Sequence, residues 1–184
     1  AAAKSEGYEW SKDKGATGAY LDLLNRLVMN DERQKAVKAS KKLLKNDRPY
    51  LRGAALDVIL SAEGDKGMSY VLSSLKDKNI EVRSSALRSV SVFPDDHVYA
   101  TVAKWIPSLP DEACVDVINW FGSRHATSQL GVVIEAIQSE NDALAMAGIT
   151  AAGRIGGPEA LKALIAQLDG KYVDKAVAAL LAFN

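Results

Sequence analysis

The sequence of 184 residues is poor in cysteine, proline and aromatic residues and has no excess of charge of either sign. Its one cysteine has no second thiol, so neither a disulfide within the chain nor a thiolate-rich metal site is available. The 23 basic residues balance 23 acidic ones, so no net field draws the chain toward nucleic acid or anionic lipid. No apolar run approaches the roughly 20 residues that span a bilayer, and no signal-peptide pattern opens the sequence. We therefore expect a soluble chain with protein partners, and the sequence leaves its compartment open.

What the chain does have is a repeating apolar pattern within a composition that is 48% hydrophobic. Four stretches superimpose at an offset of 31 residues, and each begins a helix-like run that a second such run follows. In the first helices the equivalent apolar positions are Leu51-Ala55-Leu56-Ile59, Val82-Ala86-Leu87-Val90, Ala113-Val117-Ile118-Phe121 and Leu144-Gly148-Ile149-Ala152. In the second helices they are Met68-Val71-Leu72-Leu75, Tyr99-Val102-Ala103-Ile106, Leu130-Val133-Ile134-Ile137 and Leu161-Leu164-Ile165-Leu168. Two helices per repeat at this period are typical of an α-solenoid, in which each repeat buries the apolar face of its neighbour.

The ends of the chain differ from this regular middle. Residues 1–14 are charged and have no helical period, so we expect a flexible lead there. Helices are predicted at 16–29 and 32–45 as a first, degenerate pair, and 173–184 has the pattern of the first helix of a further repeat. We expect one repeat domain over 15–184, with about five helix pairs and a half repeat, cut from a longer protein.

Two segments carry a family resemblance. Val82-Arg83-Ser84-Ser85-Ala86-Leu87 and the segment 151–170 resemble HEAT-like repeats of the short bacterial type first noted in phycobilin lyases. The resemblance covers 48–184, and 15–47 more loosely. It implies an all-α fold, a right-handed α-solenoid of HEAT-like helical hairpins, and it implies a scaffold or binding module more often than an enzyme. Within it, Gly156-Gly157-Pro158-Glu159 is explained as the end of one helix and the start of the next.

The resemblance also implies that the second helices line a concave groove, in which outward side chains would contact a partner. Trp105 stands out, because the neighbouring repeats carry Ser74, Ala136 and Gln167 at its position. It is either a binding anchor or a cover over Pro107 and the space between helices, and Tyr70 has the same two interpretations. Trp120 is predicted to pack between repeats. The candidate groove residues are Tyr70, Thr101, Lys104, Trp105, Glu135, Lys162 and Gln167.

The basic residues between Arg33 and Arg48 form one face of a predicted helix that could meet phosphates. A solvated face is the simpler interpretation, because the total charge is zero and no aromatic residues interleave. Nucleic acid is therefore not an expected partner.

A metal site and a nucleophilic cysteine are each conceivable, but each has a simpler structural interpretation. Asp95, Asp96 and His97 fall in one turn and His125 in the equivalent turn of the next repeat, where together they could hold a divalent metal. We expect instead that one aspartate caps the following helix and that His125 faces solvent. Cys114 adjoins the apolar stripe and is predicted to be a buried, inert thiol.

From the sequence we expect no metal, no cofactor and no catalytic residue. The predicted function is a non-catalytic protein–protein interaction or scaffold module, which presents its groove to a peptide or to another domain of the same chain. The alternative is an enzyme or enzyme-accessory domain that acts on nucleic acid or a tetrapyrrole, as the resemblance to HEAT-like DNA glycosylases and bilin lyases would imply.

Overall fold

The structure, a computed structural model, describes residues 14–183, and all regular elements in that range are helical. The chain forms two compact units, Ala1–Ser89 and Val90–Asn184, which are described separately below. The predicted lead at 1–14 lies outside the described residues apart from Lys14, where the first helix begins. Over 14–183 no helix combines the length and the apolar character that a bilayer crossing requires.

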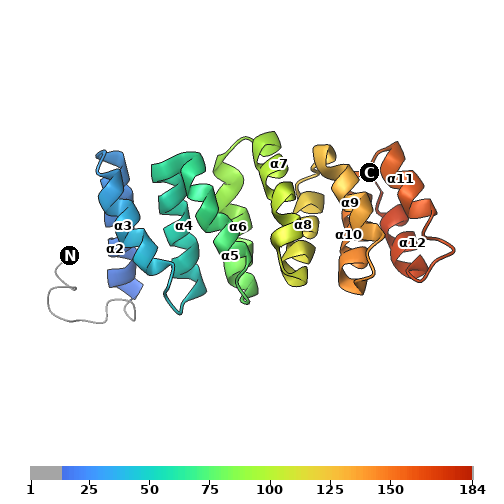
Figure 1. The fold of residues 1–184 in the computed structure, drawn as a ribbon, viewed down its shortest axis with the longest axis horizontal. Coiled ribbons are helices and arrows are strands. Elements are labelled where there is room, and N and C mark those ends of the chain that lie inside the picture. Colours follow the sequence, from blue (N-terminus) through green and yellow to red (C-terminus); the bar gives the residue numbers. More distant parts are fainter. Residues whose placement is uncertain (1–13, 184) are drawn as a thin grey trace. The chain divides into compact units, whose positions relative to one another are not determined.

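The first unit contains five α-helices within its described residues. The helices predicted at 16–29 and 32–45 are present as its first two helices. The bounds of the elements in this unit are α2 Lys14–Met29, α3 Arg33–Leu43, α4 Pro49–Glu63, η2 Gly64–Gly67, α5 Met68–Leu75 and α6 Ile80–Ser89. Helix α4 packs on α3 and on α6, and α5 also packs on α6 (Figure 1).

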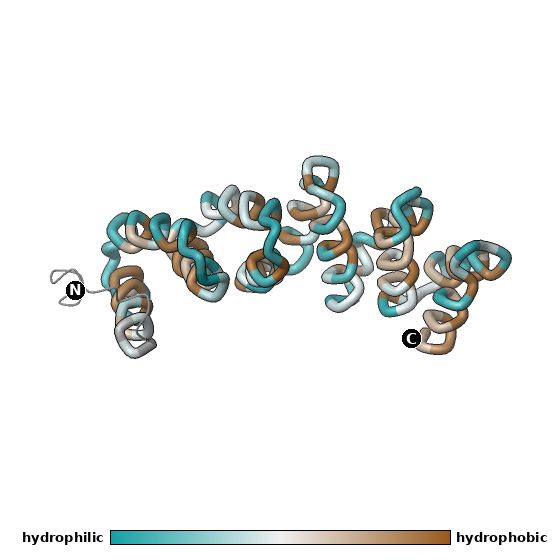
Figure 2. Tube along the Cα trace, turned by 90° about the horizontal axis from the view of Figure 1, so that it is seen from below, coloured by the Kyte–Doolittle hydropathy of each residue, from teal (hydrophilic) through white to brown (hydrophobic). Residues whose placement is uncertain are grey.

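The core of the first unit follows the predicted apolar stripe. On α4, the stripe residues from Leu51 to Ile59 have no exposed surface, and on α6 Val82 and Ala86 have none either. Apolar and polar residues alternate along these helices, which gives each helix one face to bury (Figure 2). Burial of each Leu or Ile side chain contributes about 1.5–3 kcal/mol, so this stripe stabilises the unit substantially.

The second unit contains six α-helices within its described residues. The first helices of the predicted helix pairs pack on one another in succession, α8 on α10 and α10 on α12 (Figure 1). Helix α10 also contacts α9 and α11. The bounds are η3 Val90–Val92, α7 Asp95–Trp105, η4 Ile106–Ser108, α8 Asp111–Ser123, η5 Thr127–Gln129, α9 Leu130–Ile137, α10 Asp142–Ile155, α11 Pro158–Ile165 and α12 Val173–Leu181.

Aromatic rings join α7 to α8 in the core of the second unit. The Trp120 ring meets the Tyr99 ring edge-on at a centroid distance of 5.3 Å, and Phe121 lies 5.4 Å from Trp120. Phe121 is fully buried. Trp120 therefore packs between consecutive repeats, as predicted.

Two glycines make the sharp turn between α10 and α11. Gly156 and Gly157 have φ angles of 76° and 91°, in the left-handed region that other residues rarely adopt. Pro158 follows as the first residue of α11, where its missing N–H costs no hydrogen bond. The predicted helix end and restart at this motif are confirmed.

The predicted burial is wrong at two positions of the apolar stripe. Leu161 and Ile165 on α11 are 38% and 52% exposed, whereas the equivalent Leu130 and Ile134 on α9 are half-buried. The reason is that α11 partly covers α9, but no further second helix follows α12 within residues 14–183 to cover α11. Burial of a stripe residue thus depends on its neighbour as much as on its own helix.

Candidate binding surface

The predicted groove residues are divided between the two units. Tyr70 lies on α5 in the first unit, and the others belong to the second unit. There they occupy α7 (Thr101, Lys104, Trp105), α9 (Glu135), α11 (Lys162) and the turn after α11 (Gln167). The structure brings Lys162 and Gln167 together at one hollow.

This hollow lies between α9 and α11 and has a volume of about 320 Å³. We call it the α9–α11 hollow, and it is lined by Ile134, Ile137, Gln138, Glu159, Lys162, Ala163, Ala166 and Gln167. Two isoleucines and two alanines supply apolar surface, and one acid, one base and two amides surround it. Apolar surface with a few polar groups at its edge is the usual composition of a binding site.

The charged groups of the α9–α11 hollow are available to a partner. Glu159 and Lys162 are both exposed, and neither forms an ion pair with any residue in the described range. Glu135 is exposed on α9, one residue after Ile134. A ligand at this hollow would therefore meet groups of both charges, so charge could determine its orientation as well as its affinity.

The predicted residues on α7 do not line this hollow. The Thr101 hydroxyl donates to the His97 carbonyl at 2.8 Å, so its proton is used within the helix. Lys104 is exposed and Trp105 is half-buried. A role of these residues in binding stays a prediction.

Tyr70 lies beneath a lysine of the neighbouring second helix. The Lys41 ammonium sits 5.0 Å from the centre of the Tyr70 ring, and contact with Tyr70 raises the pKa of Lys41. One face of the ring is thus already occupied by a cation. Elsewhere around α3, Lys35 pairs with Glu32 and Arg33 with Asp31, so three basic side chains have local partners.

Two of the residues weighed for a metal site, Asp95 and His125, have other partners. Asp95 accepts a hydrogen bond from Arg124 at 2.8 Å, and this contact raises the pKa of the Arg124 guanidinium. His125 Nδ1 donates to the Arg154 carbonyl at 2.6 Å, since a carbonyl can only accept. Among residues 14–183 no cluster of three or more His, Cys, Asp and Glu side chains is arranged to hold a metal ion.

The prediction that an aspartate caps the helix after the Asp95–His97 turn is wrong. Helix α7 begins at Asp95, Pro94 occupies the capping position, and no side chain there accepts a backbone hydrogen bond. The Asp95 carboxylate binds Arg124 instead. An ion pair to the next repeat has taken the place of a local cap.

The predicted burial of Cys114 is confirmed. The residue is 7% exposed, and burial, assisted by the nearby Asp111 charge, raises the pKa of the thiol. Its Sγ lies 3.5 Å from the Ile106 carbonyl oxygen. A raised pKa keeps the thiol protonated and poorly nucleophilic at neutral pH.

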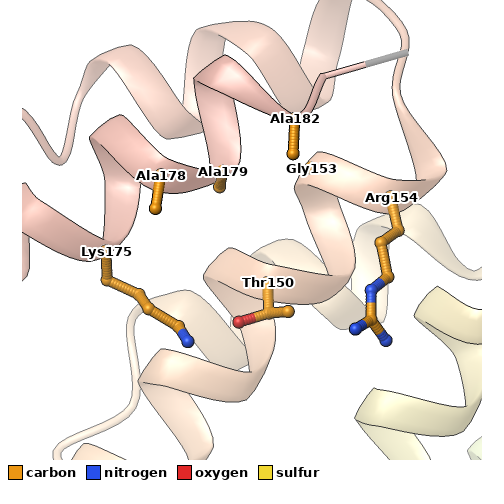
Figure 3. A pocket seen from close by; sticks show the side chains of 7 residues that line it. All are labelled: Thr150, Gly153, Arg154, Lys175, Ala178, Ala179 and Ala182. Carbon is orange, nitrogen blue, oxygen red and sulfur yellow. The ribbon is translucent and has the colours of Figure 1, made fainter.

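A second hollow, which the sequence did not indicate, lies between the first helices α10 and α12 (Figure 3). We call it the α10–α12 hollow; it has a volume of about 180 Å³ and is lined by Thr150, Gly153, Arg154, Lys175, Ala178, Ala179 and Ala182. Its lining contains two basic residues and no acidic one. The repeat pattern did not indicate this hollow, because Arg154 and Lys175 do not occupy equivalent positions of the repeat.

No model of a known protein family matches this chain, and no curated protein matches it.

Proposed function

We propose that the chain is a non-catalytic interaction module, a right-handed α-solenoid of HEAT-like helix pairs that binds a peptide or a neighbouring domain on its second-helix face. The α9–α11 hollow is the observation that supports this most, because it opens between two consecutive second helices and contains two residues predicted to contact a partner.

Polar contacts that recur between consecutive repeats support the solenoid. Asn141, the capping residue of α10, donates to Asp111, the first residue of α8, at 2.9 Å. At the equivalent positions one repeat later, Tyr172 donates to Asp142 at 2.8 Å. The same contact at successive repeats favours stacking by a common operation, which is how solenoids are built. A rigid stack loses little conformational freedom on binding.

The lining of the α9–α11 hollow indicates the chemistry of the partner. Ile134 and Ala166 offer apolar surface to one aliphatic side chain, such as Leu, Ile or Met. Lys162 favours an acidic group nearby and Glu159 a basic one. We therefore expect a peptide with a single aliphatic anchor and charged residues close to it.

A selection from a random peptide library displayed on phage tests the proposal. The dissociation constant of an enriched peptide is then measured for Ala166→Trp and for the matched control Ala143→Trp. Both alanines are exposed, the first at the end of α11 and the second near the start of α10, so neither replacement disturbs the core. The indole at 166 fills the hollow and should weaken binding about tenfold or more, because it removes the site of the anchor.

The control variant should bind as the unaltered chain does, and both variants should melt within a few degrees of it. Failure to enrich any peptide family, or equal binding by Ala166→Trp, would contradict the proposal.

The alternative, action on nucleic acid or a tetrapyrrole, ranks second because several of the basic side chains around α3 already have local partners. Binding to duplex DNA that falls steeply with rising salt would favour this alternative.

A further inference from the structure

The α10–α12 hollow has walls fixed by close helix packing. A Cβ atom added at Gly153 would lie 3.0 Å from both the Cβ and the carbonyl oxygen of Ala179, so a larger residue would require a small shift of α10 or α12. The alanines of α12 form one wall, and Ala178 and Ala182 are exposed within it. The hollow therefore presents methyl groups on a backbone that is held in place.

Two cations flank these methyl groups. Arg154 from α10 and Lys175 from α12 lie on either side of Thr150 (Figure 3). Both basic side chains are exposed, and neither forms an ion pair or hydrogen bond with a residue in the described range. The Thr150 hydroxyl donates to the Met146 carbonyl at 2.9 Å, so the attraction for an anion comes from the two cations.

The backbone acts differently on the two cations, because Arg154 lies in the last turn of α10, at the negative end of its helix dipole. Lys175 lies in the first turn of α12, where unpaired N–H groups carry the positive end of the helix dipole and disfavour a cation. Asp174, in the same turn, does not line the hollow. The carbonyl of Arg154 is held by the hydrogen bond from His125, which fixes the backbone from which the guanidinium extends.

We propose that the α10–α12 hollow binds a carboxylate with a short aliphatic stem. The carboxylate lies between the Arg154 guanidinium and the Lys175 ammonium, and the stem lies on Ala178, Ala179 and Ala182. Arginine and carboxylate match in geometry and charge. The methyl wall disfavours phosphate, because it would remove water from a strongly hydrated anion without replacing its hydrogen bonds. The ligand is either a free small acid or the glutamate side chain of a peptide, since both carry the same group.

NMR titration of the ¹⁵N-labelled chain with butyrate, and with butyramide as its uncharged counterpart, tests the proposal. Butyrate should shift the amide signals of Gly153, Ala178, Ala179 and Ala182 in a saturable way, and butyramide should not. Arg154→Gln and Lys175→Gln should each weaken butyrate binding about tenfold, because each removes a charge-assisted hydrogen bond. Lys76→Gln, an exposed lysine in the other unit, is the matched control and should bind unchanged.

Three results would overturn the proposal. They are the absence of saturable shifts, binding of butyrate by the glutamine variants as tight as by the unaltered chain, and binding of inorganic phosphate at the same amides as tight as that of butyrate. The replaced residues are exposed, so we expect the variants to fold as the unaltered chain does. Unchanged amide signals away from the α10–α12 hollow will show that they do.

A second arm identifies the source of the carboxylate. Acetylated and amidated Gly-Glu-Gly is compared with its Gly-Gln-Gly counterpart. If the glutamate peptide binds more tightly than butyrate, the source is a peptide, and if it binds more weakly, the source is a free acid. Ala166→Trp should leave both titrations unchanged, so this site and the α9–α11 hollow can fail independently.

Discussion

Each compact unit contains an ion pair between the first turn of one helix and the segment that follows the next α-helix, but the two pairs are buried to different degrees. In the first unit Arg52 pairs with Asp77, and their side chains are 24% and 22% exposed. In the second unit Lys171 pairs with Asp142, and their side chains are 67% and 55% exposed. Solvent screens the second pair much more than the first. Ion pairs of similar placement in the two units therefore need not contribute equally to stability.

Close helix packing also differs between the units. A Cβ atom added at Gly122 on α8 would lie 2.7 Å from the Ala151 Cα, a backbone atom of α10. One added at Gly53 on α4 would lie 2.8 Å from the Ser85 Cβ and 2.9 Å from its Oγ. The second unit thus brings backbone against backbone, while the first brings backbone against a side chain.

The largest expected effect is at a buried stripe position. Leu87→Ala should lower the free energy of unfolding by about 2–5 kcal/mol, because it empties a site that is 4% exposed. Leu161→Ala, at the stripe position left 38% exposed, should cost much less. Urea unfolding of both variants measures the difference, and equal losses would show that the burial of these positions is not as the structure has it.

Packing against backbone gives the next effect. Gly122→Ala should destabilise by about 1–3 kcal/mol, since the added methyl group forces two helices apart. Gly53→Ala should cost less, because one of its two closest contacts, the Ser85 Oγ, can rotate away, whereas the Cα and Cβ of Ala151 and the Ser85 Cβ move only with their backbones. The helix-propensity gain of alanine is common to both, so their difference in thermal unfolding isolates the packing. A larger loss for Gly53→Ala would reverse the comparison.

The ion pairs give the smallest effects. Partial burial would raise the pKa of Asp77, but the Asn79 N–H and the Arg52 guanidinium outweigh it, and the pKa is lowered. Asp77→Asn should therefore cost about 1–2 kcal/mol at neutral pH. A lowered folded-state pKa stabilises the fold above the unfolded value of about 3.9, and this contribution is lost as pH falls through the folded pKa.

Asp142 provides the matched comparison for Asp77. Lys171 and Tyr172 also lower its pKa, but the pair is exposed, so Asp142→Asn should destabilise less and should lose its effect in high salt. Urea unfolding at neutral and acidic pH checks both variants. A loss for Asp77→Asn that persists in acid would point to packing instead of charge.

Much of this fold could be predicted because the apolar spacing recurs every 31 residues and the same positions are buried on α4, α6 and α8. The turn at Gly156 and Gly157 could be predicted because few other residues tolerate positive φ. The exposure of Leu161 and Ile165 could not be predicted, because the apolar period shows which face of a helix is apolar and does not show which element covers that face.

The candidate sites show the same limit. Lys162 and Gln167 follow from the outward positions of a second helix, whereas Ile134 and Glu159 were missed because a hollow depends on the separation of two helices. The α10–α12 hollow was missed entirely, because it depends on how closely Gly153 lets α12 approach.

Amide hydrogen exchange with and without an enriched peptide tests the central proposal most directly. If the chain binds its partner at the α9–α11 hollow, the peptide should slow exchange along α9 and α11, with the strongest protection near Ile134 and Lys162. Protection confined to α3, or to the first helices α8 and α10, would contradict the proposal that the second-helix face is the binding surface.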